Sequence, residues 1–220
     1  MKMRQFLLLS SLVTLLVCFS CSDDVEDLPQ YTKCPDGNHP HLIDLGLPSG
    51  TMWSCSNIGA SSPEGYGGYF AWGETEEKSA YDMSTYKYFV LSPFKYIHIG
   101  EDIAGTKYDV ARVSWGGLWR MPSFDQFEEL CNCCTITWTT QNGVYGRLVT
   151  GKNGGTIFLP AAGGYLGPDS FRADEVGFYW MSSINQLDEG TAYCLAFDYS
   201  SCTWTTSGRY YGISVRAVCQ

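Results

Sequence analysis

The strongest constraint on the fold is a series of turn signals that divides the sequence into short β-hairpins. Asn142-Gly143 separates two runs rich in Thr, Val, Tyr and Trp. An Asn-Gly pair between such runs is typical of a two-residue hairpin turn. Other turns are expected at Pro48-Ser49-Gly50, near Asn153-Gly154 and around residues 199–201. Short strands joined by tight turns predict small antiparallel sheets.

One helix signal interrupts this pattern. Ser123 is followed three residues later by Gln126, which is the spacing of a capping box. Pro122 disfavours helix for the residue before it, so the chain should enter this helix from an extended segment. Apolar side chains then share one helical face: Phe124, Phe127, Leu130, Cys131 and Cys134. The sequence predicts one short capped helix at about residues 123–133.

The region between these elements carries weaker signals. Residues 61–77 contain four glycines and Pro63 among large aromatic side chains, which favours a long ordered loop over a strand. Tyrosines continue through residue 108 without helical or alternating spacing. No element is assigned there from the sequence.

The N-terminus indicates export. Lys2 and Arg4 precede an uncharged apolar run from residue 6 to residue 19, which is typical of a secretory signal. Cys21 follows the small residue Ser20, and this resembles a lipoprotein cleavage site in which the cysteine becomes the acylated first residue. We therefore expect a signal peptide at 1–20 and lipidation at Cys21. Ordinary signal cleavage without lipidation is the alternative.

Residues 21–40 are interpreted as an acidic tether, followed by a single domain at 41–220. Asp23, Asp24, Glu26 and Asp27 stand directly behind Cys21, as in the surface-export signal of Bacteroidetes-type lipoproteins; a solvated spacer is the alternative. Without Lys2 and Arg4, 12 basic residues face 23 acidic ones, a formal charge near −11. Such a charge argues against nucleic acid as a partner. The expected location is the outer membrane, through the lipid anchor, facing the cell exterior.

Besides the lipidated Cys21, the mature chain keeps eight cysteines: Cys34, Cys55, Cys131, Cys133, Cys134, Cys194, Cys202 and Cys219. An even count in an exported chain favours disulfides. The spacing of Cys194 and Cys202 suits facing positions of one hairpin. The groups Cys131/Cys133/Cys134 and Cys34/His39/His41 lack the two-pair spacing of structural zinc, so no metal and no cofactor are expected.

Ordered blocks of the sequence resemble a known family. These are DLGLPSGTMW, CSNIGASSPEGYGGYFAWGETEEKS, WGGLWRMPSFDQFEELC, CTITWTTQNGVYG, IFLPAAG, GFYWMSS and YYGISVRAV. Together they resemble the Fibrobacter succinogenes major paralogous domain over residues 44–219. That family is similar to C-type-lectin-like domains and to the sulfatase-modifying-factor group.

The resemblance implies an α+β, C-type-lectin-like fold with small twisted antiparallel sheets, long ordered loops and pairing between the first and last strands. It implies structural roles for Arg120 and Arg216. It also implies a disulfide between Cys55 and Cys134, because family members commonly carry cysteine at those positions.

For function, the sequence favours non-catalytic binding. Sugar rings stack on aromatic side chains while carboxylates accept from their hydroxyls, and the predicted patch is Tyr66, Tyr69, Trp72, Glu74, Tyr210 and Tyr211. Burial of Trp72 in the core is the alternative. The motifs of calcium-dependent lectins are absent. No Gly-x-Ser-x-Gly motif occurs either, and the chain has 3 histidines, so no catalytic residue is assigned.

Glycosidase chemistry needs two carboxylates across a cleft, for which Glu74 and Asp198 are candidates without a known separation. The expected role is therefore a cell-surface lipoprotein that binds an extracellular glycan or protein. A sulfatase-modifying-factor-like oxidase and a self-assembling structural component are the alternatives.

Overall fold

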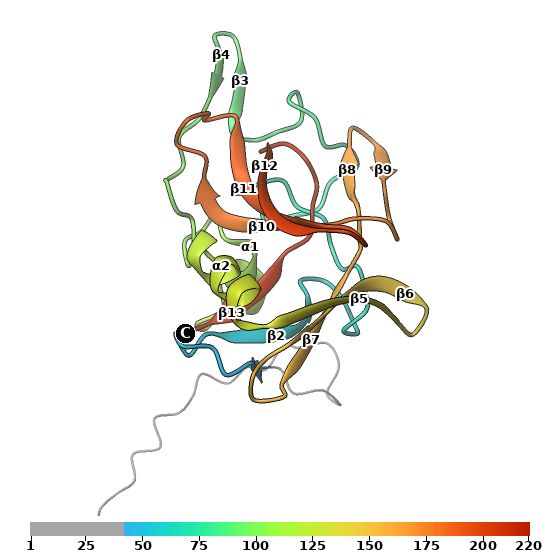
Figure 1. Cartoon of the computed structure of the whole chain (residues 1–220). Coiled ribbons are helices and arrows are strands. Elements are labelled where there is room, and N and C mark those ends of the chain that lie inside the picture. Colours follow the sequence, from blue (N-terminus) through green and yellow to red (C-terminus); the bar gives the residue numbers. More distant parts are fainter. Residues whose placement is uncertain (1–41) are drawn as a thin grey trace, which may run out of the picture.

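A computed structural model describes residues 42–220 (Figure 1). The predicted signal peptide, the Cys21 lipidation site and the tether lie outside the described residues. The strands are β1 (Leu42–Asp44), β2 (Met52–Asn57), β3 (Phe89–Leu91), β4 (Phe94–Tyr96), β5 (Thr135–Gln141), β6 (Val144–Thr150), β7 (Thr156–Pro160), β8 (Gly164–Leu166), β9 (Asp169–Phe171), β10 (Gly177–Ile184), β11 (Thr191–Phe197), β12 (Cys202–Gly208) and β13 (Arg216–Cys219). The helices are α1 (Val110–Trp115) and α2 (Phe124–Cys133).

The two ends of the described chain meet in one antiparallel sheet with the order β1-β2-β13. Trp53 of β2 lies opposite Ile43 of β1 on one side and Val218 of β13 on the other. The expected direct pairing between the first and last strands is not made: the last strand, β13, pairs with β2, and the first strand, β1, pairs with the other edge of β2. Because β2 is central, its side chains are almost all buried.

Two further three-stranded sheets follow the predicted hairpins, with the orders β5-β6-β7 and β10-β11-β12. In the turn between β5 and β6, Asn142 has φ 50° and Gly143 has φ 85°, which is the backbone of the predicted Asn-Gly turn. Gln141 pairs with Val144 across it. The turns predicted at residues 48–50, 153–154 and 199–201 also join paired strands. The prediction of small antiparallel sheets is confirmed.

Helix α2 begins as predicted. The Ser123 hydroxyl accepts from the Gln126 backbone N–H, and the Gln126 side chain accepts from the Ser123 N–H, so both halves of the capping box are present. Its apolar face packs on the β10-β11-β12 sheet and on β2, where the Phe127 and Trp53 ring centroids are 5.0 Å apart. In Figure 1 the helix lies beneath β10–β12 and beside β13.

The expectation of one helix is wrong, because the unassigned region contains α1. Asp109 is its N-cap and is fully buried. One carboxylate oxygen accepts from the backbone of Ala111 and Arg112, and the other accepts from Gly105 and Met121. A six-residue helix is too short to show a clear period. A contact with the distant Met121 fixes its start.

The same region contains the β3–β4 hairpin, which projects from one end of the molecule (Figure 1). Residues 61–77 form no strand beyond an isolated bridge between Phe70 and Ile213, as predicted for an ordered loop. The backbone N–H of Trp72 donates to the carbonyl of Arg209 and holds this loop to the C-terminal part of the chain.

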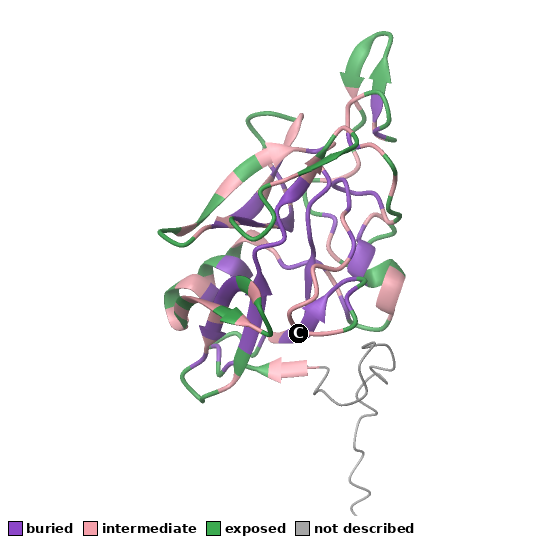
Figure 2. Ribbon diagram, turned by 90° about the vertical axis from the view of Figure 1, so that its right-hand side faces the viewer, coloured by how far each residue is buried: buried purple, intermediate pink, exposed green. Residues whose placement is uncertain are grey.

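Two large apolar clusters fill the interior, and Figure 2 shows buried residues gathered in the middle of the molecule. The Trp180 cluster includes Trp72, Trp180 and Val215. The Phe127 cluster includes Trp53, Phe127 and Leu195. A smaller Tyr81 cluster, formed by Ala71, Tyr81, Tyr86 and Phe89, lies under the projecting hairpin.

Arg216 has the structural role expected for it. It is fully buried, and its guanidinium donates to the Asn57 side chain and to the carbonyls of Ser54 and Phe158. It therefore ties the β1-β2-β13 sheet to β7. Arg120 is half-buried and donates to the Gln220 side chain.

The predicted cysteine pairing within the β11–β12 hairpin is wrong. Cys194 lies opposite Thr205, and Cys202 lies opposite Phe197. Cys194 is part of the Trp180 cluster, whereas Cys202 packs against the Phe127 cluster, so the two side chains are on opposite faces of the sheet. Among residues 42–220 no two sulfurs lie at disulfide distance, and this includes the expected pair Cys55 and Cys134.

Candidate functional site

The structure does not support the predicted aromatic patch as a binding surface, and Trp72 is the clearest correction. Its ring is fully buried in the Trp180 cluster, and its Nε1–H donates to the carbonyl of Met181 at 2.9 Å. The Arg209 guanidinium lies 4.9 Å from the ring centroid. No face of this indole is open to a ligand.

Glu74 is also engaged inside the protein. Its side chain is almost completely buried. Lys78 Nζ lies 2.9 Å from one carboxylate oxygen, and the backbone N–H of Lys87 donates to the other at 2.7 Å. Its carboxylate therefore orders residues 74–87 and is not available to sugar hydroxyls.

The remaining tyrosines of the patch are half-buried and mostly pack against the fold. Tyr66 donates to Asp174, and Tyr69 donates to the carbonyl of Ala162 at 2.7 Å. Burial raises the pKa of both hydroxyls well above its usual range. Tyr69 and Tyr210 pack against the Tyr81 cluster, while Tyr211 packs against the Trp180 cluster. These side chains hold the loops together.

Asp198, the second carboxylate considered for glycosidase chemistry, stabilises the turn between β11 and β12. The hydroxyl and backbone N–H of Ser200 donate to it, as does the N–H of Ser201. These hydrogen bonds lower the pKa of Asp198 to about 2, and the bond from the Ser200 hydroxyl has the largest effect. Asp198 and the buried Glu74 therefore both have structural partners in this fold.

A different aromatic group lies where α2 meets the β10-β11-β12 sheet. Phe124 of α2 is 5.3 Å from Tyr193 of β11 and 5.3 Å from Trp204 of β12, measured between ring centroids. Tyr193 and Trp204 are 5.9 Å apart. Trp204 is 52% exposed. This triad contains a half-exposed indole, whereas the indole of the predicted patch, Trp72, is fully buried.

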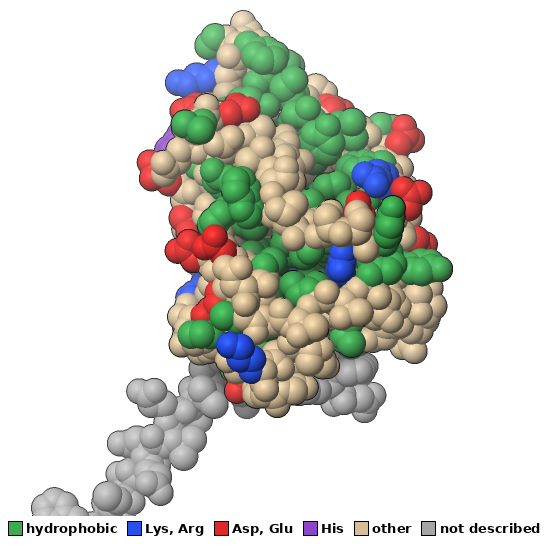
Figure 3. Space-filling model, viewed as in Figure 1, with side chains coloured by type: hydrophobic (Ala, Val, Ile, Leu, Met, Phe, Trp, Pro, Cys, Tyr) green, Lys and Arg blue, Asp and Glu red, His purple; other side chains and the backbone are tan. Residues whose placement is uncertain are grey.

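The triad borders a cleft of about 200 Å³. Its walls are Phe124, Phe127, Glu128, Cys131, Asn132, Met181, Leu195, Cys202, Thr203 and Trp204. Glu128 and Asn132 are exposed polar residues on α2, and Thr203 is an exposed hydroxyl on β12. An apolar floor with a few polar groups at the rim is the usual composition of a ligand site. Figure 3 shows hydrophobic side chains on this face.

Strand alternation explains how the sequence builds this cleft. Leu195 pairs with Trp204, and Phe197 pairs with Cys202. Side chains two residues apart share one face of a sheet, so Tyr193, Leu195 and Phe197 point to the side where Cys202 and Trp204 also lie. Helix α2 covers that side with Phe124, Phe127 and Cys131. Because β12 is an edge strand, Trp204 stays half open to solvent.

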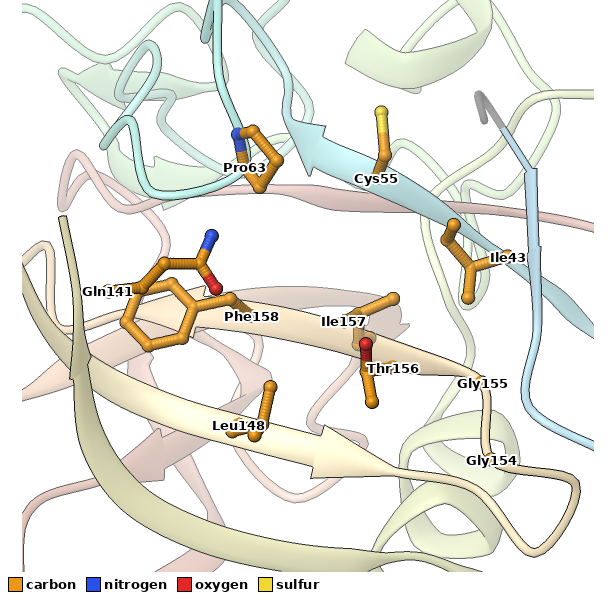
Figure 4. Close-up of a pocket in the computed structure, with 10 residues that line it drawn as sticks. All are labelled: Ile43, Cys55, Pro63, Gln141, Leu148, Gly154, Gly155, Thr156, Ile157 and Phe158. Atoms are coloured by element: carbon orange, nitrogen blue, oxygen red, sulfur yellow. The ribbon is translucent and has the colours of Figure 1, made fainter. Parts of the chain in front are cut away.

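A second cavity, of about 450 Å³, lies between β1–β2 and the β5-β6-β7 sheet (Figure 4). Ile43 and Cys55 form one side, and Leu148 and Phe158 contribute from β6 and β7. Gln141 lines it, and its amide donates to Glu64 at 3.3 Å. The other polar side chain on its walls is the Thr156 hydroxyl. This cavity has volume but few polar groups that converge on a ligand.

The described residues offer no metal centre: no group of three or more His, Cys, Asp and Glu side chains within 42–220 could hold an ion. The oxidase alternative needs a close pair of late cysteines, and Cys194 and Cys202 lie on opposite faces of their sheet. In the same part of the chain no helix is long and apolar enough to cross a membrane.

The sequence interpretation missed Tyr193 and Trp204. Strand alternation could have identified them. In a hairpin that turns around residues 199–201, the side chains of Tyr193 and Trp204 fall on the same face of the sheet. Comparisons with models of protein families, with curated proteins and with solved structures gave no match for this chain.

Proposed function

We propose that this protein is a cell-surface lipoprotein whose domain binds an extracellular glycan without catalysis, in the cleft between α2 and β12. The observation that carries the proposal is the triad of Phe124, Tyr193 and Trp204, whose rings lie within 6 Å of one another with Trp204 half exposed. This replaces the loop patch around Trp72 as the binding surface.

The chemistry of the cleft suits a sugar ring. The apolar C–H face of a pyranose can lie against the indole of Trp204, and buried aromatic area supplies most of the binding energy in such contacts. Glu128 and Asn132 stand at the rim, where a carboxylate and an amide can accept and donate hydrogen bonds to sugar hydroxyls. The small volume suits one or two sugar units of a longer chain.

Surface display rests on the N-terminal signal, the lipid position at Cys21 and the acidic residues behind it. A C-type-lectin-like fold is part of the proposal. It is supported by the pairing of β2 with β13, the capped helix α2 and the long loop at residues 58–88. Loops on such a scaffold can vary without loss of the core.

The test is a glycan array probed with the full chain, followed by titration of the best glycan against wild type and Trp204→Ala. Trp204 is 52% exposed, so this variant should fold. Loss of one stacking contact should weaken binding by roughly tenfold. We expect binding to be unchanged by a calcium chelator, since the proposed contacts to the sugar are ring stacking and hydrogen bonds with Glu128 and Asn132.

Tyr199→Ala is the matched control. Tyr199 is an aromatic residue in the turn of the same hairpin, 76% exposed and outside the cleft. It should bind the glycan as wild type does. Binding that survives Trp204→Ala, or an array without any hit, would contradict the proposal. Concentration-dependent self-association without glycan would support the structural-component alternative.

A further inference from the structure

Two cysteines from distant parts of the chain meet at the floor of this cleft. Cys131 lies in α2 and Cys202 is the first residue of β12. A hydrogen bond links the Cys131 and Cys202 thiols. Both side chains pack against the Phe127 cluster, and both line the cleft, so they are reachable from solvent.

The elements that carry them are held face to face. Cys131 follows Phe127 by four residues and therefore lies on the helical face that packs on the sheet. Cys202 lies opposite Phe197 at the turn end of the β11–β12 hairpin and points to the same side as Trp204. Packing of α2 on β12 therefore fixes the approach of the two sulfurs.

The two thiols differ in electrostatic environment. The hydrogen bond with Cys131 lowers the pKa of Cys202; burial opposes this shift, and the nearby Arg147 guanidinium adds to it. Arg147 is itself fixed, because it donates to the carbonyls of Asp198 and Ser201 just before Cys202. The same hydrogen bond and burial raise the pKa of Cys131. Since the thiolate is the nucleophile, Cys202 is the more reactive thiol of the pair.

We propose that Cys131 and Cys202 are a redox pair that closes to an intramolecular disulfide by exchange with an external disulfide. The Cys202 thiolate attacks one sulfur of the donor, forming a mixed disulfide and releasing the other sulfur as a thiolate. Cys131 then loses its proton and attacks Cys202, expelling the second donor sulfur. Two thiols of the chain are oxidised, and one donor disulfide is reduced to two thiols.

The closed disulfide joins α2 covalently to β12. It fixes the width of the aromatic cleft, because Phe124 and Trp204 belong to the two joined elements. The pairing does not depend on what the cleft binds, so failure of the glycan proposal leaves it standing. It also differs from the expected pairings Cys55–Cys134 and Cys194–Cys202.

The experiment is disulfide mapping of the full chain. The chain is reduced, desalted and incubated with oxidised glutathione, and its remaining thiols are alkylated before digestion with trypsin. Cleavage after Arg120 and Arg147 gives peptide 121–147, and cleavage after Arg172 and Arg209 gives peptide 173–209. We expect these two peptides to be joined, and the link to disappear on reduction.

Each peptide also contains other cysteines, which supply matched controls. The link should be absent from Cys131→Ser and Cys202→Ser and present in Cys133→Ser and Cys194→Ser. In Cys131→Ser the mixed disulfide should accumulate as a glutathione adduct on Cys202, which a purely structural contact does not produce. Complete alkylation of both wild-type peptides, or a link that persists in Cys202→Ser, would overturn the proposal.

Discussion

At the scale of single residues, buried polar groups decide how this fold closes. Asp109 accepts from four backbone N–H groups that belong to Gly105, to the start of α1 and to Met121. Arg209, also fully buried, donates to Tyr86 and to the carbonyls of Glu189 and Ile97. Each side chain joins segments far apart in sequence, so neither role could be recognised from local sequence.

Asp109 gives a prediction with a definite pH dependence. Burial raises the pKa of Asp109 above its usual value, and the four hydrogen bonds reduce that rise without reversing it. A raised folded-state pKa means that the folded state holds this proton to higher pH than the unfolded chain does. The contribution to stability from its titration is therefore fully present below the unfolded pKa and is lost as pH rises through the folded pKa.

The measurement is urea unfolding of wild type and Asp109→Asn between pH 3 and pH 7. The asparagine keeps one acceptor but places an NH₂ group near two N–H donors, so we expect a loss of roughly 1–3 kcal/mol. The substitution also removes the ionisable carboxyl group at position 109. The stability of wild type relative to the variant should fall as pH rises above the unfolded-state pKa, and a constant difference would show that Asp109 does not titrate there.

At the scale of elements, local sequence specifies the start of α2, and substitutions in its capping box test this. Ser123→Ala removes the acceptor for the Gln126 N–H and should destabilise the protein by about 1 kcal/mol. Because the reciprocal bond comes from the Gln126 side chain, the losses for Ser123→Ala and Gln126→Ala should not add in the double variant. Additive losses in thermal unfolding would mean that the two halves of the box act independently.

The elements that could be predicted are those set by local sequence, and the elements that could not are set by tertiary contacts. Hairpin turns at Asn142-Gly143 and Pro48-Ser49-Gly50 depend on backbone preferences of the residues themselves, and the capping box depends on residues three apart. Helix α1 depends on Asp109 reaching Met121, and the β3–β4 hairpin rests on the Tyr81 cluster. Their signals are tertiary contacts and do not appear in local sequence.

The candidate site shows the same limit. Trp72 stands among other aromatic residues, whereas Trp204 stands among threonines and serines, and neither setting indicates whether the ring is exposed. Trp72 is buried because Met181 and Arg209 lie over it, whereas Trp204 is half exposed because β12 is an edge strand. Exposure of an aromatic residue depends on strand order and helix placement, which the sequence alone did not reveal.

At the scale of the whole molecule, the proposed Cys131–Cys202 disulfide encloses β5 to β11 in one covalent loop of about 70 residues. Closing a loop of that length restricts the unfolded chain and stabilises the folded state by up to about 4 kcal/mol. For a domain of this size each kcal/mol corresponds to a few degrees, so oxidation should raise Tm by roughly 10 °C.

Thermal unfolding of the full chain in oxidised and reduced glutathione measures this difference. Cys131→Ser should lack this rise in Tm in oxidised glutathione, because the loop cannot close and Cys202 can only take up glutathione. Cys133→Ser lies two residues away in the same helix and should keep the redox-dependent shift. If Cys131→Ser and wild type respond alike to oxidation, the stabilising disulfide lies elsewhere in the chain, and the link between α2 and β12 is held by packing alone.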